Sequence, residues 1–129
     1  MYSILVCDDE KDIVSALKIY LMADGYQVFE AYNGKEALEV LKEQDIHLVL
    51  MDIMMPIKNG YEAAKMIRSL DREDAKVIPI IAMTANVFTE DKMRAKEAGM
   101  DEHIAKPVDG KLLVKVINEL VKRDQREKL

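Results

Sequence analysis

Five short apolar runs alternate with five amphipathic stretches along this chain of 129 residues. The runs cover residues 4–7, 26–31, 46–51, 77–83 and 103–105, and apolar side chains recur at helical spacing after each of them. Strands that alternate with helices form a parallel sheet with helices on both faces. We therefore predict one α/β domain, a doubly wound five-stranded parallel sheet with five flanking helices.

The composition fits one globular domain, because half of the residues are apolar and a third are charged. The net charge of −5 disfavours a broad nucleic-acid surface. The single cysteine, Cys7, lies within an apolar run, which is typical of a buried structural thiol. No apolar stretch has the length of a membrane span and no signal peptide pattern is present. We expect a cytoplasmic protein whose domain binds neither nucleic acid nor membrane directly.

Local signals place the element boundaries. Asn33 precedes Glu36 by three residues, as in a capping box at the start of a helix. Pro79 is expected to be the first residue of the fourth strand, because proline cannot donate a ladder hydrogen bond. We expect the domain to cover residues 1–122, with the polar residues 123–129 as a tail or the start of a linker.

Polar side chains stand at the ends of four predicted strands: Asp8 and Asp9 after the first, Asp52 after the third, Thr84 after the fourth and Lys106 after the fifth. Chemistry in such sheets gathers at the carboxyl ends of the strands, where the strand order reverses. If the order is 2-1-3-4-5, the first and third strands are neighbours and the carboxylates converge. Each residue alone also fits a helix cap or a solvated loop. The combination is what predicts a site.

Three carboxylates in one cleft repel one another, which favours a bound cation. Hard oxygen ligands with room for water suit Mg²⁺ or Mn²⁺. A metal ion beside Lys106 would form a site for a dianionic phosphoryl group, and an aspartate can act as the nucleophile that forms an acyl phosphate. The residues therefore predict phosphoryl transfer.

Four motifs identify the chain as similar to the receiver domain of bacterial two-component response regulators: ILVCDDE, LVLMDIMMPIKNGYE, PIIAMTA and IAKP. They occur in this order and extend over essentially the whole chain. The resemblance implies a flavodoxin-like receiver fold with strand order 2-1-3-4-5. It also implies a signalling domain and not an enzyme. Such a domain catalyses only its own phosphorylation and dephosphorylation.

The resemblance implies roles for the residues at the strand ends. Asp52 would be the phosphate acceptor. Asp9 would bind the metal directly, Asp8 would assist it, and the backbone carbonyl of Met54 would complete the protein ligands. Thr84 would bond a phosphoryl oxygen, and Lys106 would pair with Asp52 and later with the phosphoryl group.

The resemblance also implies switch residues near these strand ends. Ala85 is small and would leave room for Thr84 to move, and the peptide bond between Lys106 and Pro107 would be cis. The family usually has tyrosine or phenylalanine three residues before the lysine, where this chain has His103. His103 can therefore be a pH-sensitive switch residue or an ordinary side chain at the sheet edge.

The implied phosphate donor is a sensor histidine kinase or a histidine phosphotransfer protein. The implied receiver of the signal is an output domain or target protein, contacted by the face that the fourth helix, fifth strand and fifth helix form. A homodimer that forms on phosphorylation is a further partner that the resemblance allows.

Two alternatives share parts of this pattern. A flavodoxin-like nucleotide or flavin binder would place glycines or hydroxyls where this chain has DDEKD. A metal-dependent aspartyl-phosphate phosphatase would need an acid two residues after Asp52, where this chain has Met54.

Overall fold

The computed structural model describes residues 2–53, 59–71, 73–84 and 89–121. Its five strands pair in parallel in the order β2-β1-β3-β4-β5. They are β1 (Ser3–Cys7), β2 (Gln27–Ala31), β3 (Leu48–Asp52), β4 (Ile80–Thr84) and β5 (Glu102–Ala105). The predicted fold class and strand order are confirmed.

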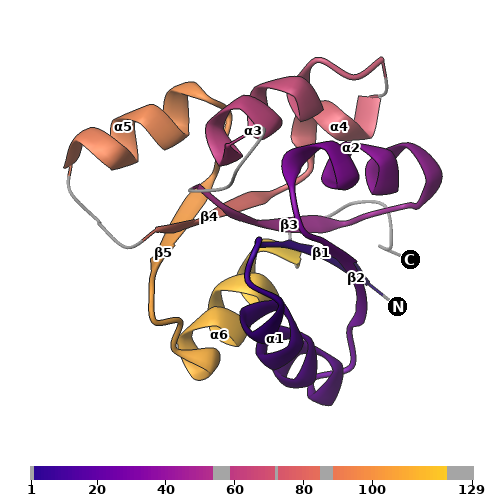
Figure 1. Cartoon of the computed structure of the whole chain (residues 1–129), viewed down its shortest axis with the longest axis vertical. Helices are drawn as coiled ribbons and strands as arrows, with labels where there is room; N and C mark the ends of the chain where they lie inside the picture. The colour runs from indigo at the N-terminus through magenta and orange to yellow at the C-terminus, as the bar shows by residue number, and fades with distance from the viewer. Residues whose placement is uncertain (1, 54–58, 72, 85–88, 122–129) are drawn as a thin grey trace.

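Helices cover both faces of the sheet, with α1 and α6 on one face and the other helices on the opposite face (Figure 1). They are α1 (Lys11–Ala23), α2 (Gly34–Glu43), α3 (Gly60–Arg68), α4 (Glu73–Val77), α5 (Thr89–Glu97) and α6 (Gly110–Val121). Among the described residues, no helix has both the length and the apolar composition needed to cross a bilayer.

The described residues form six helices, whereas the sequence predicted five. The additional helix, α4, is a single short turn at the point where the fourth apolar run was expected to begin. Val77 ends this turn and is 76% exposed, so it belongs to no buried strand. Pro79 lies just before β4 instead of being its first residue, although its carbonyl oxygen accepts a hydrogen bond from the Val49 N–H at 2.9 Å. Apolarity alone did not distinguish a short helix from the strand that follows it.

The three central strands are buried along their whole length. Alternate side chains point to opposite faces, so Ile4 packs in the layer under α1 and α6 while Leu5 packs under the helices of the other face. Cys7 is completely buried, as expected of a structural thiol, and donates to the Asn33 carbonyl oxygen at 3.4 Å. Burial, followed by the charges of Asp8 and Asp52, raises the Cys7 pKa well above its usual range.

Asparagine caps fix the start of two helices. The Asn33 side chain accepts from the Glu36 N–H at 2.9 Å, and the Glu36 carboxylate accepts from the Tyr32 N–H at 2.9 Å. The predicted capping box is present, with its return bond one residue earlier than in the standard pattern. Asn59 caps α3 in the same way, because its side chain accepts from the Glu62 N–H at 2.9 Å.

Candidate functional site

The three predicted carboxylates meet where two neighbouring strands end. Asp8 directly follows β1 and Asp52 is the last residue of β3, and these strands pair through Cys7 and Met51. One oxygen from each of Asp8, Asp9 and Asp52 lies within 4.8 Å of the others. Asp8 is fully buried and Asp52 is 4% exposed, whereas Asp9 faces solvent. The cluster therefore has a buried floor and one carboxylate at its open side.

Lys106, which follows β5, reaches into this acidic cluster. Its Nζ lies 3.1 Å from Asp52 Oδ1 and 2.9 Å from Asp8 Oδ2. The pairing with Asp52 was anticipated, whereas the contact with Asp8 was not. Burial acts to lower the Lys106 pKa, but the contacts with the two carboxylates outweigh it and the pKa is raised. Lys106 is therefore a fixed positive charge at the centre of the site.

One ammonium does not neutralise three carboxylates, so excess negative charge remains in the cluster. The Glu10 N–H donates to Asp8 Oδ1 at 3.0 Å. The buried Asp8 Oδ2 has the Lys106 ammonium nearby but no hydrogen-bond donor in good geometry among the described residues. Excess charge and an undersaturated carboxylate oxygen are what a hard divalent cation compensates. The three clustered carboxylates therefore fit a hard divalent cation such as Mg²⁺ or Mn²⁺.

Thr84 and Pro107 lie next to the acidic cluster along the chain or through a backbone contact, whereas His103 lines a cavity with Arg68 and Gly99. Thr84 is the buried last residue of β4, and its carbonyl oxygen accepts from the Lys106 N–H at 2.8 Å. The Lys106–Pro107 peptide bond is cis, as the resemblance implied. His103 is half-buried in β5 and pairs with Ala82 of β4. Met54 and Ala85 lie outside the described residues.

Gly60 is a site residue that the sequence analysis missed. Its N–H donates to the Ile53 carbonyl oxygen at 2.9 Å, which brings the first turn of α3 against the end of β3. A Cβ on Gly60 would lie 2.4 Å from the Asp52 carbonyl oxygen and 2.8 Å from Ile53 Cα. No pattern of residue types in the sequence shows that this glycine packs against the backbone of Asp52.

Comparison with known proteins gives a match to the response regulator receiver domain over residues 4–118. The chain belongs to this family. AfsQ1, a transcriptional regulatory protein of Streptomyces coelicolor, is 34% identical over 127 residues, which are 98% of this chain and 54% of that protein. This receiver chain thus spans about half the length of the curated relatives that it matches.

Solved receiver structures have the same fold. The chemotaxis protein CheY4 of Vibrio cholerae has a TM-score of 0.88 and 28% identity, covering 93% of this chain and 98% of that one. The receiver domain of the Pseudomonas aeruginosa sensor histidine kinase PA1611 has a TM-score of 0.85 and 29% identity, covering 94% of this chain and 98% of that one. In the latter structure a magnesium ion is coordinated in the active site cleft.

Membership of the receiver family makes the domain a phospho-accepting switch of two-component signalling. Neither alternative is favoured. The loop after β1 presents Asp8 and Asp9 where a nucleotide or flavin binder would need neutral donors to a phosphate. The position two residues after Asp52 is a methionine, which cannot transfer a proton as the acid of a phosphatase does.

Proposed function

We propose that this receiver domain takes a phosphoryl group from a phosphohistidine donor onto Asp52 and catalyses both this transfer and the later hydrolysis. The observation that carries the proposal is the convergence of Asp8, Asp9 and Asp52 within 4.8 Å, with the Lys106 Nζ 3.1 Å from Asp52 Oδ1. Phosphoryl transfer needs mainly positioning and neutralised charge. The arrangement of these four side chains supports both requirements.

In the proposed step, a carboxylate oxygen of Asp52 attacks phosphorus, and the bond from phosphorus to the donor imidazole nitrogen breaks. The bonding electrons return to that nitrogen, so the products are an acyl phosphate and a histidine. Asp8, Asp9 and Asp52, with the carbonyl of Met54, would hold Mg²⁺ or Mn²⁺, which neutralises phosphoryl oxygens when bound. The Lys106 ammonium, already beside Asp52, is placed to pair with a phosphoryl oxygen.

The proposed output is a shift of the face formed by α5, β5 and α6, which corresponds to the fourth helix, fifth strand and fifth helix of the sequence analysis. Thr84 and Lys106 would move toward the phosphoryl group, with Ala85 leaving room for Thr84. Thr84 is the last residue of β4, and Lys106 directly follows β5, so both residues lie at the ends of strands next to this face. To change the ratio of active to inactive molecules from 1:99 to 99:1, phosphorylation must favour the active state by about 5.5 kcal/mol. His103 and Pro107 remain proposed switch positions.

Acetyl phosphate with Mg²⁺ tests the function without a protein donor. Intact-mass spectrometry is expected to show the mass of one phosphoryl group, lost again on standing or in hydroxylamine because the product is an acyl phosphate. Chelation of the metal by EDTA should abolish labelling, since the acidic cluster then repels the phosphoryl group. Steady turnover of a small phosphoester without a labelled intermediate would instead support the phosphatase alternative.

The surface beside the site supports a protein donor. A cleft of about 170 Å³ lies between α1 and the segment after β5, and its lining includes Ile13, Ala16, Tyr20 and Lys106. Tyr20 is 53% exposed although it is aromatic. Since Lys106 belongs to both the cleft and the acidic site, a helix seated in the cleft would bring its histidine close to Asp52. We propose this cleft as the docking site of the kinase or phosphotransfer protein.

A bulky side chain in the cleft should slow phosphorylation by a protein donor without affecting phosphorylation by acetyl phosphate. Replacing exposed Ala16 with arginine is expected to lower the phosphotransfer rate from a phosphorylated histidine protein at least tenfold, a loss of about 1.4 kcal/mol in donor binding. Labelling by acetyl phosphate should stay unchanged. Ala23→Arg is the matched control, because it lies on the same helix about 10 Å further along and outside the cleft. Equal effects of the two variants would contradict this docking site.

The signalling context is also a proposal. AfsQ1 is a transcriptional regulatory protein, and we propose by analogy that residues 1–122 control an output domain or target protein in the cytoplasm. Residues 123–129, which lie outside the described residues, would then be a tail or the start of a linker. Sedimentation of the phosphorylated and unphosphorylated domain tests whether the switch acts through a homodimer.

A further inference from the structure

Helix α5 buries few apolar side chains of its own. Among Met93–Glu97, the part of the helix whose side chains the structure describes, Ala95 is the one buried residue, and Met93 is 58% exposed. Helix α3, by contrast, buries the side chains of four residues: Tyr61, Ala63, Ala64 and Ile67. Burial of one alanine stabilises the position of a helix only weakly. Ala98 and Met100, which follow the helix directly, are also buried in the core, so packing just beyond the helix holds its carboxyl end together with polar contacts.

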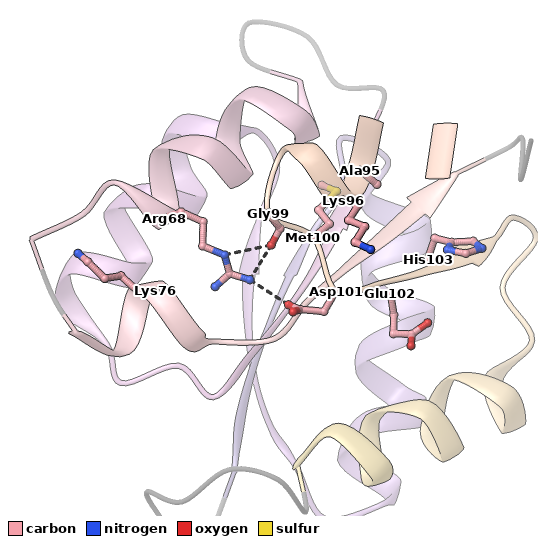
Figure 2. A pocket seen from close by; sticks show the side chains of 9 residues that line it. All are labelled: Arg68, Lys76, Ala95, Lys96, Gly99, Met100, Asp101, Glu102 and His103. Atoms are coloured by element: carbon pink, nitrogen blue, oxygen red, sulfur yellow. Dashed lines mark hydrogen bonds and ion pairs between the residues drawn. The ribbon is translucent and has the colours of Figure 1, made fainter. Parts of the chain in front are cut away.

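Arg68, the last residue of α3, makes such a contact at the carboxyl end of α5 (Figure 2). Its Nε and Nη2 donate to the Gly99 carbonyl oxygen at 3.0 and 2.6 Å. Its Nη1 donates to the carbonyl oxygens of Ala75 at 3.2 Å and Ile78 at 2.6 Å. Nη2 also donates to Asp101 Oδ2 at 2.9 Å. All five N–H groups of the guanidinium are thus engaged within the protein, so it joins segments of the fold and has no donor left for a ligand.

Asp101 extends these contacts to the start of β4. Its Oδ2 accepts from the Ile80 N–H at 2.8 Å, and its own N–H donates to the Ile80 carbonyl oxygen at 2.8 Å. Arg68 and Asp101 together therefore connect the end of α3, the start of β4 and the turn between α5 and β5. Burial lowers the Arg68 pKa and Asp101 opposes this, but the guanidinium remains charged near neutral pH because its ordinary pKa is so high.

The turn after α5 is shaped around the Arg68 side chain. Gly99 has a φ of +96°, a left-handed conformation that favours glycine, and a Cβ there would lie 2.8 Å from Arg68 Cγ. Beside this turn is an open cavity of about 550 Å³ that runs along α5 and β5, and its lining includes Lys96, Gly99 and His103. The cavity, Gly99 and the Arg68 contacts all lie at the carboxyl end of α5.

A second contact joins the middle of α5 to the start of α3. The Arg94 guanidinium lies over the Tyr61 ring, 4.5 Å from its centroid. Cation–π contacts at exposed sites contribute about 0.5–1 kcal/mol, which is less than several charge-assisted hydrogen bonds at one guanidinium provide. The stronger restraint is therefore at Gly99.

We infer that Arg68 is a positioning residue that fixes the carboxyl end of α5, so that this helix responds to phosphorylation at its amino end and pivots about Gly99. The inference rests on the proposed function. Thr84 ends β4, and the chain continues from it to Thr89 at the amino end of α5. A movement of Thr84 toward a phosphoryl group therefore reaches that end of the helix first, while Arg68 holds the other end.

Hydrogen exchange measured by mass spectrometry on the whole chain tests the restraint without phosphorylation. In Arg68→Met, the amides of residues 95–101 should exchange at least about tenfold faster than in the wild type, because local opening no longer breaks charge-assisted hydrogen bonds. Exchange in β1 and β3 should stay unchanged. Lys96→Met is the matched control, since exposed Lys96 lines the same cavity without belonging to the Arg68 contacts, and it should resemble the wild type.

Phosphorylation with acetyl phosphate tests the pivot itself. In the wild type, phosphorylation should change exchange in the amino-terminal half of α5 and leave residues 99–101 unchanged. In Arg68→Met, the phosphorylation-dependent change should extend to residues 99–101. A purely structural role would raise exchange equally in both states and leave this difference between them unaltered. Arg68→Lys, which keeps the charge but not the five donors, should show intermediate behaviour.

Wild-type exchange at residues 95–101 in Arg68→Met would overturn the inference, as would an equal phosphorylation-dependent change at both ends of α5 in the wild type. If Arg68→Met does not fold, Asp101→Asn removes one charged partner and should shift exchange in the same direction by a smaller factor; no shift would overturn the inference as well. Absence of labelling at Asp52 would refute the proposed function, while the exchange of unphosphorylated variants would still decide whether Arg68 fixes α5.

Discussion

Replacing Asp52 with asparagine is expected to abolish labelling by acetyl phosphate and to stabilise the metal-free domain. The amide lacks the carboxylate oxygen that attacks phosphorus. It also removes one of three negative charges that lie within 4.8 Å of one another, while Lys106 keeps its partner Asp8 at 2.9 Å. The free energy of unfolding in EDTA should therefore rise by about 1 kcal/mol.

Intact-mass spectrometry after labelling and urea unfolding in EDTA measure the two effects of Asp52→Asn. Asp71→Asn is the matched control, because it removes an exposed carboxylate that lies outside the site. It should label fully and unfold like the wild type. Undiminished labelling of Asp52→Asn would mean that another residue accepts the phosphoryl group. A lower stability in EDTA would mean that the Lys106–Asp52 contact outweighs the repulsion among the carboxylates.

The position of the acidic cluster could be predicted because it depends only on strand order and strand ends. Once β1 and β3 are neighbours in a parallel sheet, residues that follow them meet at one edge, whatever the surrounding loops do. Asp8, Asp9 and Asp52 stand at these ends, so the sequence was sufficient. The contact between Lys106 and Asp8 was not predictable in this way, because it depends on how far a long side chain reaches across the sheet.

The features that the sequence did not reveal are contacts with backbone atoms. Arg68 binds the carbonyl oxygens of Ala75, Ile78 and Gly99, and any residue type can provide a carbonyl oxygen. The role of Gly60 cannot be predicted from the sequence either, because this residue acts by leaving space beside the Asp52 carbonyl group. Such contacts leave no pattern of residue types along one chain, so they appear only when the fold brings the segments together. The same holds for α4, whose short turn has no periodicity of its own.

Replacing Gly60 with alanine is expected to impair both folding and phosphorylation. The added Cβ would lie 2.4 Å from the Asp52 carbonyl oxygen, and ordinary contacts begin at 3.4 Å, so α3 and the end of β3 must separate. Backbone atoms cannot rotate away as a side chain does. We expect a loss of stability at the upper end of the range of about 1–3 kcal/mol for overpacked sites. A displacement on the order of 1 Å at Asp52 should also lower the labelling rate on the order of 100-fold.

Gly25→Ala separates this steric effect from the loss of a glycine as such. Gly25 has a φ of +91°, and no atom of the part of the chain that the structure describes lies within 4 Å of its added Cβ. Its replacement should therefore introduce backbone strain of about 1–2 kcal/mol without a collision. Urea unfolding should therefore show a lower stability for both variants. The initial rate of labelling at fixed Mg²⁺ should be lower for Gly60→Ala alone. A wild-type labelling rate in folded Gly60→Ala would show that close packing against the Asp52 backbone does not position the acceptor.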